Sequence, residues 1–175
     1  MFRAADKWLM GYLRSVLRRP GRVAGLRHLM FCVADHYEPF LGGVTSAQAQ
    51  VIVRRWAAGY LPAVKDFRDA DGVLPSQTFF YPAEAYDAGC VGMLADLCAR
   101  GCGEVEVQLH HRFDTAEDLR WKLEEYRDCL HGKHGLLGKD YAGAVRYGFV
   151  HGNWALCNSR PDGDWCGVNE ELGVL

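Results

Sequence analysis

Two adjacent histidines and a nearby aspartate follow a stretch in which apolar and polar residues alternate. The stretch "EVEVQLHHRFDT", residues 104–115, alternates like a strand, ends on His110 and His111, and reaches Asp114 three residues later. Asp35 and His36 follow an earlier apolar run. A hydrolytic zinc-type site needs about three His or carboxylate ligands and an open position for water. The metal lowers the pKa of that water to about 7, and a nearby carboxylate can take its proton. These residue types therefore fit metal-assisted hydrolysis.

Four segments have the residue pattern of strands. The apolar run at 29–34 is predicted to be a buried strand that ends on Asp35 and His36. The segments "QTFFYP" at 77–82, "EVEVQL" at 104–109 and "AVRYGFVHGNWAL" at 144–156 are the other candidates.

Helices are expected between these strands. The capping-box spacing of Thr45 and Gln48 predicts a helix that continues to about residue 67. A second helix is predicted at 93–100, and a third begins after Thr115 and closes near 132–135. Strands that alternate with helices are typical of βα units around a parallel sheet. We therefore predict an α/β fold, and four strands correspond to half of a barrel.

Polar residues follow three of the four predicted strands. Functional groups collect beyond the carboxyl ends of the strands in such folds, so side chains distant in the sequence are expected to meet there. The candidates are Asp35 and His36 after the first strand, His110, His111 and Asp114 after the third, and His151 and Asn153 after the fourth.

Each candidate also has an ordinary structural interpretation. Successive side chains of a strand point to opposite faces, so His110 and His111 cannot share one direction. We favour His110 as the ligand and His111 as a neighbouring or substrate-contacting group, although both would also suit a solvated loop. Asp114 precedes a helix start, where carboxylates also act as caps. Asp35 and His36 would also suit a turn.

Several motifs, taken in order, resemble the polysaccharide deacetylase, or NodB-homology, family of metal-dependent carbohydrate deacetylases. The family has "TFDDG" after its first strand, "ATFF" in its second and "EIGxHxxxH" at the end of its third. This chain has "FCVADHYEP", "QTFFYP" and "EVEVQLHHRFD", and the likeness covers residues 28–155. The motifs "ADHYEPF" and "HGNWAL" resemble those of a divergent branch of deacetylase-like proteins associated with bacterial surface polysaccharides.

The resemblance implies roles for individual residues. Asp35 falls on the catalytic base, and His36, His110 and Asp114 fall on the three metal ligands. Two of the three ligand positions exchange residue type, His for Asp and Asp for His, but a two-His, one-carboxylate set remains. His151 is a candidate acid or substrate contact. His111, Asn153 and Trp154 are candidates for contacts with the sugar.

The resemblance also implies a fold and an activity. We expect a (β/α)-barrel of the deacetylase type, with residues 23–175 as its N-terminal portion. The expected enzyme is a hydrolase that uses a divalent metal, zinc foremost, to remove acetyl groups from a carbohydrate. The alternative is a catalytically inactive carbohydrate-binding or scaffolding relative, which the altered ligand positions favour.

Composition limits the other partners. The net charge of −2 argues against a nucleic-acid binder, and no apolar run is long enough to span a membrane. Residues 1–22 are basic and have the apolar spacing of an amphipathic helix, which would either pack on the domain or lie on an anionic membrane surface. Seven cysteines without an export signal indicate reduced thiols. We expect a cytoplasmic protein, with peripheral membrane contact as the alternative.

Overall fold

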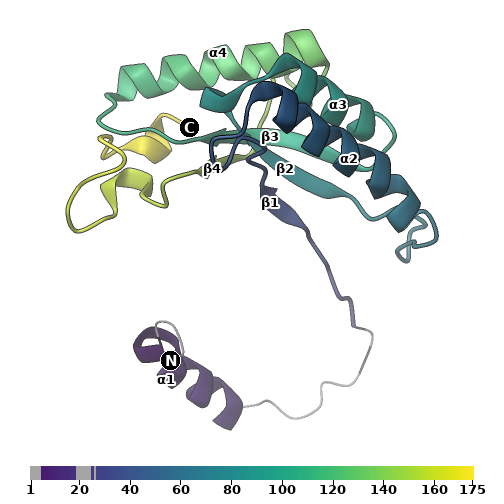
Figure 1. Ribbon diagram of the computed structural model, residues 1–175. Helices are drawn as coiled ribbons and strands as arrows, with labels where there is room; N and C mark the ends of the chain where they lie inside the picture. Colours follow the sequence, from purple (N-terminus) through teal and green to yellow (C-terminus); the bar gives the residue numbers. More distant parts are fainter. Residues whose placement is uncertain (1–4, 19–24, 26) are drawn as a thin grey trace. The chain divides into compact units, whose positions relative to one another are not determined.

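The computed structural model describes residues 5–18, 25 and 27–175, and the chain divides into two compact units, 1–31 and 32–175 (Figure 1). In the first unit, α1 (Ala5–Leu17) confirms the predicted N-terminal helix over the residues described. Positions 1–4 and 19–22 of the predicted segment lie outside the described residues. No side chain of α1 is buried. No described helix is long and apolar enough to cross a membrane.

The second unit is built on a sheet of four parallel strands that lie side by side in chain order. They are β1 (Ala34–His36), β2 (Gln77–Pro82), β3 (Gly103–Leu109) and β4 (Phe149–His151). The sheet curls into an open half-barrel. The predicted α/β class and parallel sheet are therefore confirmed.

Three helices connect successive strands and cover one face of the sheet (Figure 1). They are α2 (Ser46–Val64), α3 (Ala88–Cys98) and α4 (Ala116–His134). A parallel connection has to return across the sheet, and a helix makes this crossing while burying its own apolar side. The three short 3₁₀ turns are η1 (Ala83–Ala85), η2 (Leu156–Asn158) and η3 (Glu171–Gly173).

The predicted caps of α2 and α4 are present. The Thr45 hydroxyl accepts from the N–H of Gln48, whose side chain in turn bonds the N–H of Thr45. Thr115 and Asp118 form the same capping box at the start of α4. Gly135 ends α4 with a φ of 65°, a left-handed conformation that glycine adopts without a steric penalty.

Alternation along the strands separates the core from the open face. Val105, Val107 and Leu109 are buried against the helices, together with Phe79 and Tyr81 of β2. The intervening residues of β3 therefore point to the other face of the sheet, and His110 continues that series at the end of the strand.

The predicted first strand is wrong in position and burial. The strand begins at Ala34, while Leu29, Met30 and Phe31 are almost fully exposed. Residue 34 pairs with Thr78, and β2 begins only one residue earlier. The apolar run at 29–32 therefore precedes the paired residues of β1, and no strand of the described residues pairs with it.

Two other boundaries differ from the prediction. Helix α3 begins five residues before the predicted 93, because the Asp87 side chain accepts from the N–H of Cys90 and starts the helix there. Only Phe149–His151 of the thirteen-residue fourth segment is a strand. Its register with β3 covers three residue pairs, after which the chain turns at Gly152 and Asn153.

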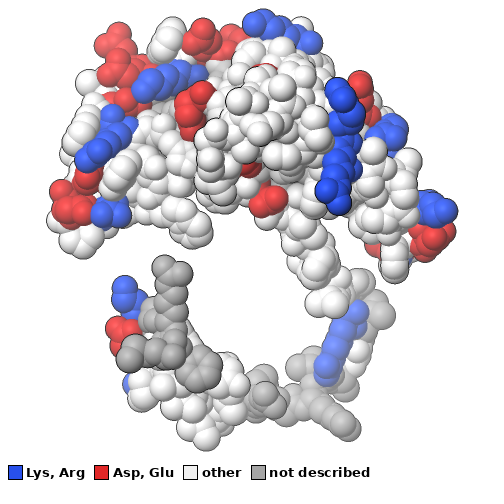
Figure 2. All heavy atoms as spheres, viewed as in Figure 1, with Lys and Arg blue, Asp and Glu red and all other residues white. Residues whose placement is uncertain are grey.

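Charged side chains of both signs are intermixed on the face of the second unit that Figure 2 presents. The mixture of signs is consistent with the formal net charge of −2 for the whole chain.

Candidate functional site

The two adjacent histidines at the end of β3 lie on opposite sides of the strand. His110 is partly exposed, whereas His111 is buried. The predicted alternation is therefore confirmed, and each imidazole enters a different group of polar side chains.

The buried cluster consists of His111, His151, Cys166 and Glu171, and all four side chains are buried. Each offers one ligand atom, and the four atoms lie within 4.8 Å of one another. The cluster could hold a metal ion. Two members come from the ends of β3 and β4, and the other two come from the segment that follows β4.

Glu171 is the centre of the hydrogen bonds in this cluster. Its Oε1 lies 3.0 Å from Nε2 of His111, and its Oε2 accepts from the N–H of Cys157 at 2.8 Å and from Sγ of Cys166 at 3.1 Å. Burial alone would raise the pKa of Glu171, but these hydrogen bonds and the nearby His151 outweigh it and lower the pKa. Burial raises the pKa of the Cys166 thiol.

Two imidazole nitrogens of the cluster are buried without a hydrogen-bond partner among the described residues, Nδ1 of His111 and Nε2 of His151. Nδ1 of His111 lies 3.5 Å from Oδ2 of Asp114, and Nε2 of His151 lies 3.7 Å from Oε1 of Glu171. Burial lowers the pKa of His151. The nearby Glu171 acts to raise this pKa, whereas the imidazoles of His111 and His110 lower it further. The described side chains therefore leave these two buried imidazole nitrogens without a satisfied hydrogen bond.

The edge cluster consists of His36, Glu38, Glu84 and His110, which lie at the carboxyl ends of β1, β2 and β3. Nδ1 of His110 makes a short contact with Oε1 of Glu84. Nε2 of His110 and Nδ1 of His36 lie 3.5 and 3.7 Å from the same oxygen of Glu38. Two imidazoles thus face one carboxylate oxygen, and all of these side chains keep contact with solvent.

An exposed aromatic surface adjoins the edge cluster. The Trp154 ring is stacked on His36, with ring centroids 5.6 Å apart and planes within 6° of parallel. Trp154 is 82% exposed. Flat exposed aromatic rings provide apolar faces on which a sugar ring can stack.

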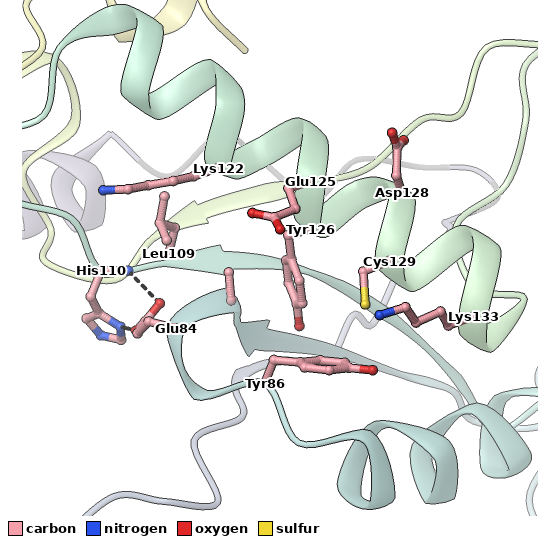
Figure 3. A pocket seen from close by; sticks show the side chains of 11 residues that line it. Glu84, Tyr86, Leu109, His110, Lys122, Glu125, Tyr126, Asp128, Cys129 and Lys133 are labelled. Carbon is pink, nitrogen blue, oxygen red and sulfur yellow. Dashed lines mark hydrogen bonds and ion pairs between the residues drawn. The ribbon is translucent and has the colours of Figure 1, made fainter.

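A pocket with a volume of about 660 Å³ lies between α4 and the residues after β2 (Figure 3). The His110–Glu84 pair is at one end of the pocket and Lys133 at the other, with Tyr86 and Tyr126 between them. A ligand in this pocket would therefore reach the His110–Glu84 pair.

The predicted metal ligands are divided between different surroundings. His36 and His110 both belong to the edge cluster. Asp114 instead accepts from Nζ of Lys122 with both oxygens, each at 2.7 Å, and faces His111. No hydrogen bond or ion pair within the described part of the chain joins Asp114 to His36 or His110.

The predicted site residues Asp35, His151 and Asn153 lie outside the edge cluster. Asp35 is exposed, and as the neighbour of His36 within β1 it points to the opposite face. His151 lies in the buried cluster. The Asn153 side chain donates to the carbonyl of His111 at 2.8 Å, so it holds the turn after β4 against the end of β3.

Four residues of these clusters were not predicted from the sequence. Glu84 directly follows β2, so the rule that functional groups follow strand ends could have identified it. Glu38, two residues after His36, could have been found in the same way. Cys166 and Glu171 lack a recognisable ligand spacing, and only the folded chain brings them to His111.

The fold and both clusters define an α/β half-barrel with a buried group that could hold a metal ion. Comparison of the chain with protein-family models, with curated proteins and with solved structures found no match.

Proposed function

We propose that the chain is a metal-dependent hydrolase that removes acetyl groups from a carbohydrate, and that its chemistry takes place at the edge cluster. The observation that carries this proposal is the series Glu84–His110–Glu38, in which one imidazole lies between two carboxylates at the strand ends. We further infer that the four strands belong to a (β/α)-barrel of the deacetylase type.

His36, Glu38 and His110 are suited to hold a divalent ion, zinc foremost. Ligand atoms around a tetrahedral zinc ion with bonds of 2.0–2.2 Å lie roughly 3.3–3.6 Å apart. The separations of 3.5 and 3.7 Å between the Glu38 oxygen and the two imidazoles are close to this spacing. Nε2 of the buried Gln108 side chain donates to the same Glu38 oxygen and lies 3.5 Å from Nε2 of His110, so an ion bound here would displace this amide. Partly exposed ligands leave room for water and substrate.

Glu84 is suited to orient His110. Metal-binding histidines generally donate their second ring N–H to a carboxylate, which fixes the tautomer and the ring orientation. The contact of Glu84 with Nδ1 leaves the lone pair on Nε2 directed toward Glu38. Glu84 is therefore a positioning residue.

A divalent ion bound at this edge supplies a water of lowered pKa and polarises the acyl carbonyl. The hydrolysis also needs a proton acceptor. Asp35 remains the proposed base, because its carboxylate is exposed and makes no hydrogen bond within the described part of the chain. Asp35 lies on the other face of β1 from His36, so its role as the base would require the end of the strand to turn its carboxylate toward the edge cluster.

The carbohydrate is proposed from the aromatic surface beside the edge cluster. Trp154 stacks on His36 and leaves most of its surface exposed, so a sugar bound on Trp154 would lie next to the proposed ligands.

Acetate release from acetylated oligosaccharides by the purified chain tests this function. With added zinc, wild-type protein should release acetate, and His110→Ala should reduce the rate at least about 100-fold through the loss of a ligand. Glu84→Gln should reduce it about 10–100-fold and weaken metal affinity at the same time. His28→Ala, an exposed histidine of the other unit, is the matched control and should leave the rate unchanged.

The inactive carbohydrate-binding alternative gives a different result. Under this alternative, Trp154→Ala should lose saccharide binding, whereas Trp121→Ala, which changes an exposed tryptophan of α4, should keep it. No variant should release acetate. If the chain neither binds saccharides nor releases acetate, the proposal is wrong.

A further inference from the structure

We propose that the buried cluster is a closed zinc site, separate from the edge cluster, whose ion fastens the segment after β4 to the end of β3. His111, His151, Cys166 and Glu171 are its four ligands. This inference does not depend on the proposed hydrolase function.

The surroundings of His111 carry the first part of the argument. Its Nε2 lies 3.0 Å from the Glu171 carboxylate, and its Nδ1 lies 3.5 Å from the Asp114 carboxylate. In its neutral form an imidazole has only one N–H, so one of its nitrogen lone pairs then faces a carboxylate oxygen. A cation between Nε2 and Glu171 removes this repulsion, because Nδ1–H can then donate toward Asp114. A carboxylate behind a ligating histidine is the usual arrangement at metal sites.

The donor set indicates which metal the cluster would select. One thiol, two imidazoles and one carboxylate provide the sulfur, nitrogen and oxygen ligands that zinc accepts in four-coordinate sites. The four ligand atoms already lie within 4.8 Å of one another, so contraction by about 1 Å gives the spacing of a tetrahedral site.

Burial indicates a structural rather than a catalytic ion. Catalytic zinc sites keep a position open for water, whereas structural sites are closed by four protein ligands. All four side chains here are buried, and the two unpartnered imidazole nitrogens belong to them.

Metal binding requires three proton movements, of which the first is the shift of the His111 proton from Nε2, which faces Glu171, to Nδ1, which faces Asp114. The Cys166 thiol loses its proton to solvent when sulfur binds the ion. In this structure, Nδ1 of His151 accepts a hydrogen bond from the N–H of Asn153 at 3.1 Å, so the imidazole proton of His151 is on Nε2. When Nε2 binds the ion, this proton moves to Nδ1, and the hydrogen bond with the Asn153 N–H is broken.

The site would hold a segment with little regular structure of its own. Residues 152–175 contain only the short turns η2 and η3. Other contacts between this segment and the residues after β3 are the two-bond ion pair of Arg112 with Asp164, the hydrogen bond from the Asp114 N–H to the carbonyl of Cys166 and that from the Asn153 side chain to the carbonyl of His111. One ion would bring ligands from both sides together.

Cobalt substitution of the metal-free 175-residue chain tests the proposal without a mutation. Co²⁺ bound by Cys166 gives a thiolate-to-metal charge-transfer band and the intense visible bands of tetrahedral coordination. The edge cluster contains no sulfur, so the charge-transfer band distinguishes the buried cluster from the edge cluster and is independent of deacetylase activity. Stoichiometric Zn²⁺ should displace the Co²⁺ and remove the band.

Two variants and a labelling experiment complete the test. Cys166→Ala should lose the band and weaken Zn²⁺ affinity at least about 100-fold. Cys102→Ala, an equally buried cysteine outside the cluster, should retain both properties. In wild-type protein, Zn²⁺ should slow alkylation of Cys166 at least 10-fold and leave that of the exposed Cys32 unchanged. Absence of the band, together with zinc-independent alkylation of Cys166, would overturn the proposal.

Discussion

Nε2 of His111 lies 3.0 Å from Oε1 of Glu171, across 60 residues of sequence, and both side chains are buried. This pair joins the end of a central strand to a 3₁₀ turn in the segment after the sheet. The preceding residue, His110, makes the corresponding contact with Glu84 on the other side of the strand. Two adjacent imidazoles therefore serve two separate clusters.

The buried carboxylate of Glu171 should stabilise the fold even without metal. Glu171→Gln removes the negative charge but keeps the shape, which leaves His111 and the Cys157 N–H with a weaker acceptor. We expect a loss of about 3 kcal/mol in the free energy of unfolding, since disrupting a buried charged pair is costly. Urea unfolding in the presence of a chelator measures it.

Glu170→Gln is the matched control, because the neighbouring Glu170 is exposed. Its effect should remain within about 0.5 kcal/mol. Equal effects of the two substitutions would show that the contacts of Glu171 add nothing to stability.

The close packing of His110 on Gly152 provides a second prediction. A Cβ added at Gly152 would lie within 2.4–2.6 Å of three ring atoms of His110, so alanine there must displace the imidazole. Gly152→Ala should reduce acetate release and weaken metal binding at the edge cluster, by about 10-fold or more.

Gly148→Ala serves as the comparison, because its Cβ would meet its nearest neighbour, the Glu106 side chain, at an ordinary 3.5 Å. This variant should keep wild-type kinetics. If Gly152→Ala is as active as Gly148→Ala, the position of His110 does not matter for the reaction.

The cap of α3 predicts a pH dependence of stability. Hydrogen bonds from the Ser46 hydroxyl and the Cys90 N–H lower the pKa of Asp87 to about 2, well below the unfolded value of about 3.9. Because the folded-state pKa is the lower one, this stabilisation is present above about pH 4 and is lost as the pH falls toward 2.

Asp87→Asn isolates this contribution, since asparagine can still accept the N–H of Cys90 but does not ionise. The difference in free energy of unfolding between wild type and Asp87→Asn should be constant above about pH 5 and shrink between pH 4 and 2. Urea unfolding at pH 7, 5, 4 and 3 measures it. A difference that does not change with pH would contradict the assignment.

Local sequence patterns were sufficient for much of the fold. Thr45 and Thr115 specify their caps through contacts three residues away, and the alternation from Val105 to Leu109 specifies which side of β3 is buried. These features depend on near neighbours, so the sequence contains the information for them. The same alternation correctly separated His110 from His111.

The extent of pairing and the membership of the clusters depended on distant residues. The apolar run before Ala34 resembles a buried strand, but β2 begins too late to pair with it. Asp114 has the spacing of a ligand, but Lys122, two turns along α4, takes both of its oxygens.

The sequence by itself determined that imidazoles and carboxylates would gather beyond the strand ends, because parallel strands bring their carboxyl ends to one edge. Only the tertiary structure decided which of them meet. Glu38 and Glu84 reach His110 from neighbouring strands, while Cys166 and Glu171 reach His111 from the segment after β4. No local spacing encodes these meetings, since they follow from how the connecting segments pack once the sheet has formed.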